Sequence, residues 1–260
     1  MAKQKMKSTV GRRKYILEKL DESGQVNVLE LSGQLGVSEV TIRNDLARLE
    51  DQKVLIRARG GALKIERVNT DFSLSDKNKI NLQQKRLIGI AAARLINEKD
   101  TITLDSGTTT NEIIRNLSKE IELTVVTNAI NLVNQLSEFP NITIVVPGGV
   151  LRKNSMSLVG TNAEESFKNF YSDKLFLATD GIDTTYGIST PNLDEANINR
   201  VMIEYSKQVI LVTDSSKFRK RCLAFIAPLD KIDTIITDDG ILPEDVRRLE
   251  SLGINIIISR

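Results

Sequence analysis

Small polar residues follow several short apolar stretches in the larger, C-terminal part of this chain of 260 residues. Glycines, hydroxyl side chains, carboxylates and a lysine recur at these points, and such groups hold anions and polyols by hydrogen bonds. The chain contains no histidine, so triads that use an imidazole base are excluded. The residue types therefore indicate noncovalent ligand binding. The polar segments are 105–110, 127–128, 147–149, 179–183 and 213–217.

Segment 106–110 is the strongest candidate for a phosphate site. Its glycine lets backbone N–H groups approach an anion, its hydroxyls add donors, and the helix expected to follow points its positive end to the same place. Lys217 and Arg152 can add full charge, although Arg152 fits a solvent-exposed position equally well. The predicted ligand site comprises Asp105, Ser106, Gly107, Thr108, Thr109, Thr110, Asn128, Gly148, Gly149, Arg152, Asp180, Asp183 and Lys217.

Short β-branched stretches alternate with helix-like stretches from residue 84 onward, which predicts an α/β domain with a mostly parallel sheet. Nearly all-apolar strands are typical of a sheet that is buried on both faces. The carboxyl ends of parallel strands meet at one edge, so the polar segments converge there. We expect helices over 85–96 and 109–117, and strands over 101–104, 123–126, 142–146, 174–178, 209–212, 234–236 and 254–258.

Residues 37–51 have the pattern of a short helix with one apolar and one polar face. Ser38 suits the N-cap, and the apolar residues from Ile42 to Leu49 recur at helical spacing. Another short helix is expected over 28–35, and Gly36 between the two fits a turn because glycine accepts a positive φ. This arrangement predicts a helix-turn-helix whose second helix reads duplex DNA.

A small hairpin follows, with strands 54–57 and 62–65 on either side of a glycine pair. Helices and hairpin together predict a winged helix-turn-helix with double-stranded operator DNA as its partner, the wing lying near the DNA backbone or minor groove. A helical packing domain that never meets DNA is the alternative. The predicted DNA contacts are Ser38, Glu39, Thr41, Arg43, Asn44, Arg57 and Arg59.

Charge divides the chain at the same place. Residues 1–68 hold 14 Lys+Arg and 9 Asp+Glu, a net charge of +5, whereas residues 69–260 hold 22 and 25, a net charge of −3. A basic excess in a small module is typical of a phosphate-binding face. We therefore predict a winged helix-turn-helix at 1–66, a linker at 67–82 and an α/β domain at 83–260.

Composition excludes further classes of site. With no histidine and one cysteine, Cys222, the chain can form neither a multi-ligand Cys/His zinc site nor an intramolecular disulfide. We predict no metal ion and no cofactor. An apolar run of membrane-spanning length and an N-terminal signal segment are both absent from the sequence, so we expect a soluble, cytoplasmic protein.

Motifs in both halves of the chain match one known family. They are 37–38, 41–43, 45–46, 49–50 and 57–62 in the first half, and 105–110, 127–128, 148–149, 180–183 and 214–218 in the second. On these residues the chain resembles the DeoR family of bacterial transcriptional regulators. The resemblance implies a sensor domain similar in fold to ribose-5-phosphate isomerase, a phosphorylated sugar as effector, and repression of carbohydrate genes. We expect a homo-oligomer, a dimer or tetramer, because paired reading heads match two half-sites.

The same resemblance implies that Asp180 and Asp183 contact sugar hydroxyls and that Thr108 to Thr110 hold the phosphate. A sugar-phosphate isomerase with a DNA-binding appendage is the alternative function, since Asp180, Asp183 and Glu195 can in principle transfer protons. Residues 184–189 hold neither the lysine nor the glycine-rich run of the isomerases, so we expect binding without turnover. We expect Glu195 to be a carboxylate on a helix surface.

Overall fold

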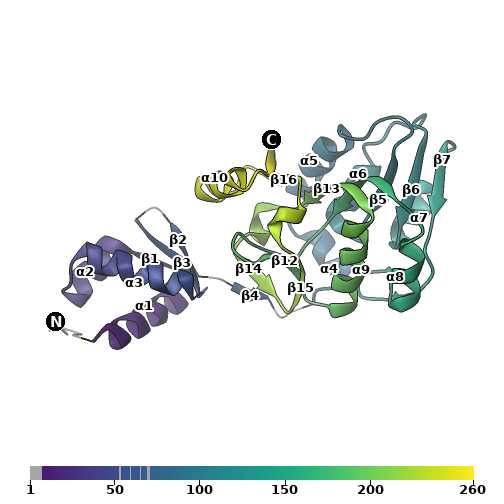
Figure 1. Cartoon of the computed structure of the whole chain (residues 1–260). Coiled ribbons are helices and arrows are strands. Elements are labelled where there is room, and N and C mark those ends of the chain that lie inside the picture. The colour runs from purple at the N-terminus through teal and green to yellow at the C-terminus, as the bar shows by residue number, and fades with distance from the viewer. Residues whose placement is uncertain (1–7, 53, 59, 65, 69–70) are drawn as a thin grey trace. The chain divides into compact units, whose positions relative to one another are not determined.

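The computed structural model describes residues 8–52, 54–58, 60–64, 66–68 and 71–260. The chain divides into two compact units, Met1–Glu66 and Arg67–Arg260 (Figure 1). Arg59, one of the predicted DNA contacts, lies outside the described residues.

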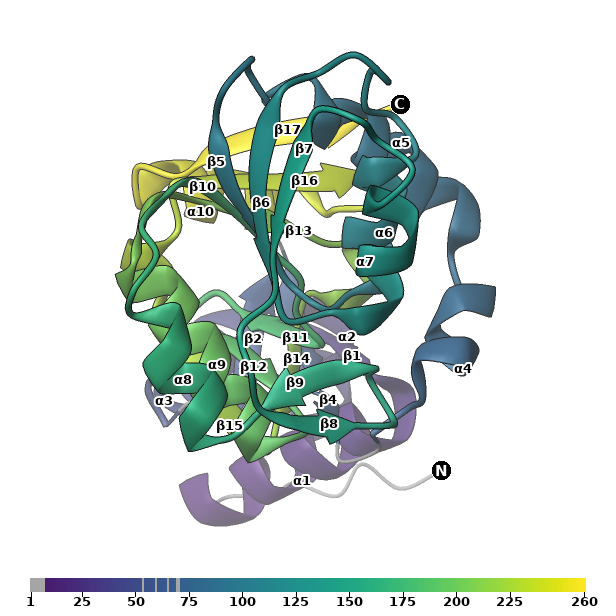
Figure 2. The same cartoon turned by 90° about the vertical axis from the view of Figure 1, so that its right-hand side faces the viewer.

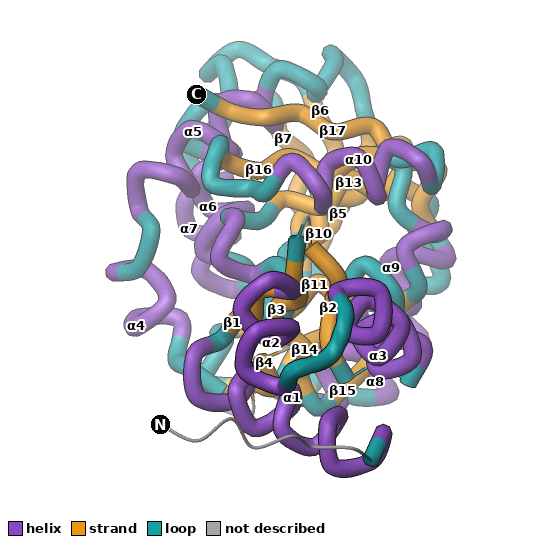
Figure 3. The backbone as a smooth tube through the Cα atoms, turned by 90° about the vertical axis from the view of Figure 1, so that its left-hand side faces the viewer, coloured by secondary structure: helices purple, strands orange, loops and turns teal. Residues whose placement is uncertain are grey.

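The described part of the first unit contains three helices beside a small antiparallel sheet of order β1-β3-β2 (Figure 3). One side of each helix packs against this sheet. Ile16, Leu31, Leu46 and Leu55 lie in the resulting core. The elements are α1 (Thr9–Ser23), β1 (Gln25–Asn27), α2 (Val28–Leu35), α3 (Glu39–Asp51), β2 (Leu55–Ala58) and β3 (Gly61–Lys64).

The two short helices of the first unit begin and end where the sequence supplies caps. Asn27 Oδ1 accepts the Leu29 N–H at 2.8 Å at the start of α2, and Ser38 Oγ accepts the Thr41 N–H at 3.2 Å at the start of α3. Gly36 ends α2 with φ of 65°, a conformation that a Cβ atom disfavours. With the β2–β3 hairpin following α3, the predicted winged helix-turn-helix is confirmed.

The second unit is built on a seven-stranded sheet of order β17-β16-β13-β10-β5-β6-β7, in which neighbouring strands are parallel. Each strand coincides with an apolar stretch predicted to be a strand, so the predicted parallel sheet is confirmed. The strands are β5 (Thr101–Leu104), β6 (Leu123–Thr127), β7 (Ile142–Val145), β10 (Ser172–Leu177), β13 (Ser206–Val212), β16 (Thr234–Asp238) and β17 (Asn255–Ser259).

Helices cover both faces of this sheet (Figure 2). Along β10, Leu175 and Leu177 join one core and Phe176 joins the other, as the two-residue period of a strand requires. The Phe176 core includes side chains of α5, α6 and α7, and the opposite core includes side chains of α8, α9 and α10. These helices are α5 (Leu82–Ala93), α6 (Thr108–Ile114), α7 (Ile130–Leu136), α8 (Thr161–Phe167), α9 (Leu193–Glu204) and α10 (Pro243–Ser251).

The shorter elements outside the seven-stranded sheet were not predicted. β11, β12 and β15 form a three-stranded sheet, and β8 with β9, like β14 with β4, forms a two-stranded one. The 67–82 segment, predicted as a linker, contains the short helix α4, and its Leu74 N–H donates to Asn154 O at 2.8 Å. The bounds are β4 (Glu66–Val68), α4 (Leu74–Lys79), β8 (Val150–Arg152), β9 (Ser157–Val159), β11 (Gly181–Asp183), β12 (Gly187–Thr190), β14 (Lys220–Cys222) and β15 (Ala224–Ala227), with 3₁₀ turns at Ser215–Lys217 and Leu229–Lys231.

None of the helices in the described residues is both long and apolar enough to cross a bilayer.

A buried ion pair joins α1 to α3 in the first unit. Asp45 is only 2 % exposed and accepts hydrogen bonds from Arg12 Nε and, at 2.9 Å, from Arg13 Nε. Because Arg12 is also buried, its charge depends on Asp45 for compensation.

Asp45→Asn should therefore destabilise the first unit. Removing one partner of a buried ion pair typically costs about 3–5 kcal/mol, because the remaining charge stays out of water. We expect faster hydrogen–deuterium exchange of the α1 and α3 amides, with the amides of β5 and β10 unchanged. Asp51→Asn, at an exposed position of the same helix, is the matched control. Wild-type exchange in Asp45→Asn would contradict this role of the ion pair.

Candidate functional site

A cavity opens at the carboxyl ends of three neighbouring strands, β5, β10 and β13. Its volume is about 180 Å³, several times the ~30 Å³ of a water molecule. Segments 105–109, 178–180 and 213–217 follow these strands, so the topology of the sheet brings their polar side chains to one place.

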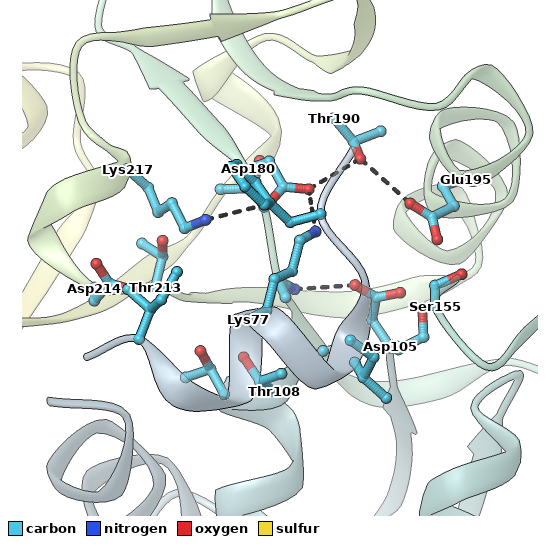
Figure 4. Close-up of a pocket in the computed structure, with 18 of the residues that line it drawn as sticks. Lys77, Asp105, Thr108, Ser155, Asp180, Thr190, Glu195, Thr213, Asp214 and Lys217 are labelled. Carbon is cyan, nitrogen blue, oxygen red and sulfur yellow. Dashed lines mark hydrogen bonds and ion pairs between the residues drawn. The ribbon is translucent and has the colours of Figure 1, made fainter. Parts of the chain in front are cut away.

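Asp180 lies at the centre of the cavity between two lysine side chains (Figure 4). Its Oδ2 accepts a hydrogen bond from Lys77 Nζ at 2.7 Å, and its Oδ1 accepts one from Lys217 Nζ at 3.2 Å. Burial alone would raise the pKa of Asp180, but the two ammonium groups outweigh burial and hold the pKa below its ordinary value. Two cations thus share one carboxylate. Lys85 and Asp214, which are of opposite charge, line the same part of the cavity, so an excess of one positive charge remains here.

The other end of the cavity is rich in carboxylates. Arg152 Nη1 donates to Glu195 Oε1 at 2.9 Å, and the same guanidinium pairs with Asp71. Nearby, Asn199 Nδ2 donates to Asp105 Oδ1 at 3.0 Å. Burial, and to a smaller extent the charge of Glu195, raises the pKa of Asp105 to about 6. This end offers acceptors suited to ligand hydroxyl groups.

Segment 105–110 is held by hydrogen bonds within itself. Thr110 Oγ1 accepts the Gly107 N–H at 3.0 Å and donates to Asp105 O at 2.7 Å. A Cβ atom at Gly107 would lie 2.7 Å from the Cβ of Ala178, which explains the glycine. The Gly107 N–H is therefore hydrogen-bonded within the loop. Thr108 and Thr109 of this segment line the cavity.

The structure brings together most of the predicted ligand residues and places the others away from the cavity lining. Those at the cavity are Asp105, Ser106, Gly107, Thr108, Thr109, Arg152, Asp180 and Lys217. Those outside the lining are Thr110, Asn128, Gly148, Gly149 and Asp183.

The residues outside the lining have structural contacts of their own. Asp183 is buried, accepts the Thr185 N–H at 2.8 Å and pairs with Arg221, so it caps a turn. Asn128 Nδ2 donates to Leu158 O at 3.1 Å. Gly149 has φ of 146°, and a Cβ atom there would meet the Cβ of Ala163 in α8. A Cβ atom at Gly148 would meet no atom within 4 Å.

Several residues of the cavity lining were not predicted from the sequence, among them Glu195 and those of segment 71–81; others are Lys85, Asn154, Ser155, Thr190, Asn199 and Lys220. Glu195, expected on a helix surface, has a side chain only 12 % exposed that faces Arg152, so that expectation was wrong. In the first turn of α9 Glu195 lines the cavity, whereas Leu193 and Asp194 are exposed. Segment 71–81, expected as part of a linker, supplies Lys77 and apolar neighbours. The N-cap serine Ser73 is the local signal that a helix starts there.

The polar face of α3 carries most of the predicted DNA contacts. Arg43 and Asn44 are exposed, and Thr41 is partly exposed. Arg43 Nη2 donates to Glu39 Oε2 at 2.6 Å, and each side chain of this pair is about half exposed. Exposed pairs at this spacing contribute only about 0.3–0.5 kcal/mol, so Arg43 can readily change partners.

The predicted contacts beside α3 are also at the surface. Ser38, at the N-cap of α3, and Arg57, in the hairpin strand β2, are exposed. The Arg57 N–H donates to Glu50 Oε1 at 3.2 Å, which fixes the hairpin strand to α3.

Acidic residues in the cavity do not form a metal site. Across the residues that the structure describes, His, Cys, Asp and Glu side chains nowhere gather in threes in a way that could hold a metal ion.

The fold and the cavity define a DNA-binding module joined to a ligand-binding α/β domain. Comparison with family models agrees: residues 12–68 match the DeoR-like helix-turn-helix domain, and residues 80–239 match the DeoR C terminal sensor domain. The chain belongs to the DeoR family of transcriptional regulators.

Two proteins of similar sequence are named as transcriptional regulators. The chain is 42 % identical over 252 residues to a protein of Escherichia coli O157:H7 provisionally named as the aga operon transcriptional repressor, covering 96 % of this chain and 94 % of that one. It is 35 % identical over 246 residues to the HTH-type transcriptional regulator GlpR of Haloferax volcanii, covering 95 % and 96 %. Among solved structures, a ribose 5-phosphate isomerase of Methanocaldococcus jannaschii aligns with 53 % of this chain and 55 % of that one, with 14 % identity and a TM-score of 0.40.

The raised pKa of Asp105 makes stability depend on pH. Its pKa is 3.8 in the unfolded reference and about 6 when folded, so the unfolded state releases the proton first and stability falls as the pH rises through this window. Asp105→Asn removes the effect, which is on the order of 3 kcal/mol at most.

We expect the stability of Asp105→Asn relative to wild type to increase from pH 4 to pH 6.5 and then level off. Thermal unfolding at each pH measures it. Burial also raises the pKa of Asp245 to about 6. Asp245 is present in both proteins, so its effect on stability cancels in the comparison. Asp239→Asn, at an exposed position, is the control. A difference that does not change with pH would contradict the prediction.

Proposed function

We propose that this chain represses carbohydrate genes under the control of a phosphorylated sugar. Two copies in a dimer or tetramer present their α3 helices to half-sites spaced by about 34 Å, one turn of the duplex, or a multiple of it. Effector binding in the cavity changes the affinity for operator DNA, with a coupling of about 1–3 kcal/mol, or 5–150-fold. The name of the Escherichia coli relative supports repression as the direction of control.

The uneven charge of the cavity is the observation that carries the effector class. Around Asp180 two ammonium groups meet one carboxylate, which favours a ligand with an anionic group. At the other end, Glu195 and Asp105 offer oxygen acceptors to hydroxyl groups. A small molecule with a phosphate at one end and hydroxyls along the rest complements both ends.

The exposed polar face of α3 supports the DNA half of the proposal. A recognition helix presents the residues of its N-terminal half to base edges and phosphates in the major groove. Thr41, Arg43 and Asn44 occupy that part of α3, and the apolar stripe on its other side is buried in the core of the first unit. The basic excess of residues 1–68 adds attraction to the phosphate backbone.

A thermal-shift screen tests the effector class. The full chain is melted with a panel of sugar phosphates and with the matching free sugars. A ligand at about 100 times its Kd stabilises the fold by roughly 2.7 kcal/mol, and we expect this from one or more sugar phosphates but not from their free sugars. Shifts by free sugars alone would contradict the phosphate assignment, and no shift from either series would contradict the effector class.

Arg43→Ala tests the DNA face. We expect binding to duplex DNA from the region upstream of the gene to weaken by about 1–3 kcal/mol, with the melting temperature unchanged because Arg43 is exposed. Fluorescence anisotropy at fixed salt measures the affinity. Arg86→Ala removes the same charge from an exposed position on α5 and is the matched control. Equal losses in the two variants would mean that α3 has no special part in binding.

A further inference from the structure

The segment 71–81, named the strap, is a part of the second unit that lines the cavity. It begins shortly after the boundary between Glu66 and Arg67, contains α4, and lies along the cavity (Figure 4). No side chain of α4 is buried. Burial of apolar surface therefore contributes little to its attachment, and polar contacts carry most of it.

Hydrogen bonds fix the two ends of the strap to loops of the second unit. Near the start, the Leu74 N–H donates to Asn154 O at 2.8 Å. At the end, Asn81 Nδ2 donates to Asp214 Oδ1 at 2.8 Å. Between these two ends the strap reaches the centre of the cavity through Lys77.

Hydrogen bonds hold the backbone at Lys77, whose side chain lines the cavity. The buried Lys85 Nζ donates to Lys77 O and, at 2.6 Å, to Ile80 O. The Lys77 side chain is 23 % exposed although α4 has no buried residue, whereas Lys79 on the same helix is exposed. The strap thus places the ammonium group of Lys77 in the cavity.

We propose that Lys77 is an effector-binding residue, and that the anionic group of the effector replaces Asp180 as the partner of the Lys77 and Lys217 ammonium groups. This assignment rests on the proposed function, because it takes the effector to be a phosphorylated molecule. It makes the strap part of the binding site, in addition to the loops that follow the strands.

A phosphate can compete with Asp180 for the two ammonium groups. Asp180 supplies one negative charge to two ammonium groups, at 2.7 Å and 3.2 Å. A phosphate monoester carries about −1.5 to −2 at pH 7 and offers three strong acceptor oxygens, so it compensates both cations where Asp180 compensates one. The Asp180 carboxylate then acts as a competitor for the anion, which predicts opposite effects of changing Lys77 and Asp180.

Isothermal titration calorimetry of the full chain with inorganic phosphate, at constant ionic strength, tests the assignment. We expect Lys77→Gln to weaken binding about tenfold. Asp180→Asn should strengthen it by a similar factor, because the competing charge is gone. Lys79→Gln, two positions along α4 and exposed, is the matched control and should bind as wild type. A folding defect cannot produce a gain in affinity, so the opposite signs separate ligand contact from structural damage.

Two results would overturn the assignment of Lys77 while leaving the effector class intact. They are wild-type affinity for phosphate in Lys77→Gln, and no gain in Asp180→Asn, each in a chain that sugar phosphates stabilise. If neither inorganic phosphate nor any sugar phosphate binds the wild-type chain, the proposed function fails and the assignment fails with it.

Discussion

One largely buried carboxylate, Asp180, holds the side chains of Lys77 and Lys217 at the centre of the cavity. The three residues are far apart in the chain, since Asp180 is separated from the two lysines by 103 and 37 positions. Moving a charge out of water costs several kcal/mol, and a partner must offset that cost. The cavity therefore takes this form only when the loops after β10 and β13 and the strap fold together, and its charge balance leaves one cation for a ligand.

Parallel topology explains why much of the site could be predicted from the sequence. Apolar, β-branched strands specify a buried sheet, and the loops that follow its central strands must lie side by side. The residues after β5, β10 and β13 were found for this reason, Asp105, Asp180 and Lys217 among them. The loop after β7 follows an edge strand, so Gly148 and Gly149 lie too far along the sheet edge to line the cavity. The helix-turn-helix could also be predicted from the sequence, because helix caps such as Ser38 and Gly36 are local features.

The remaining residues depend on contacts that no local pattern records. Lys77 and Lys79 look alike in the sequence, and only the docking of α4 turns one inward and leaves the other exposed. Glu195 lies in the first turn of a helix, where many carboxylates are exposed, but in the fold it forms an ion pair with Arg152. Strand β1 was missed for a similar reason. Its three residues carry no periodicity, and its pairing with β3 brings the backbone of Val26 close to Gly61.

We propose that ligand binding in the cavity of the second unit is energetically coupled to DNA binding by the first. Reciprocal titration measures this coupling: the affinity for operator DNA is determined with and without a saturating sugar phosphate, and the affinity for that sugar phosphate with and without the DNA. Linkage requires both affinities to change by one common factor, expected between about 5 and 150. A sugar phosphate that binds the cavity equally well in both conditions, and leaves the DNA affinity unchanged, would contradict the account.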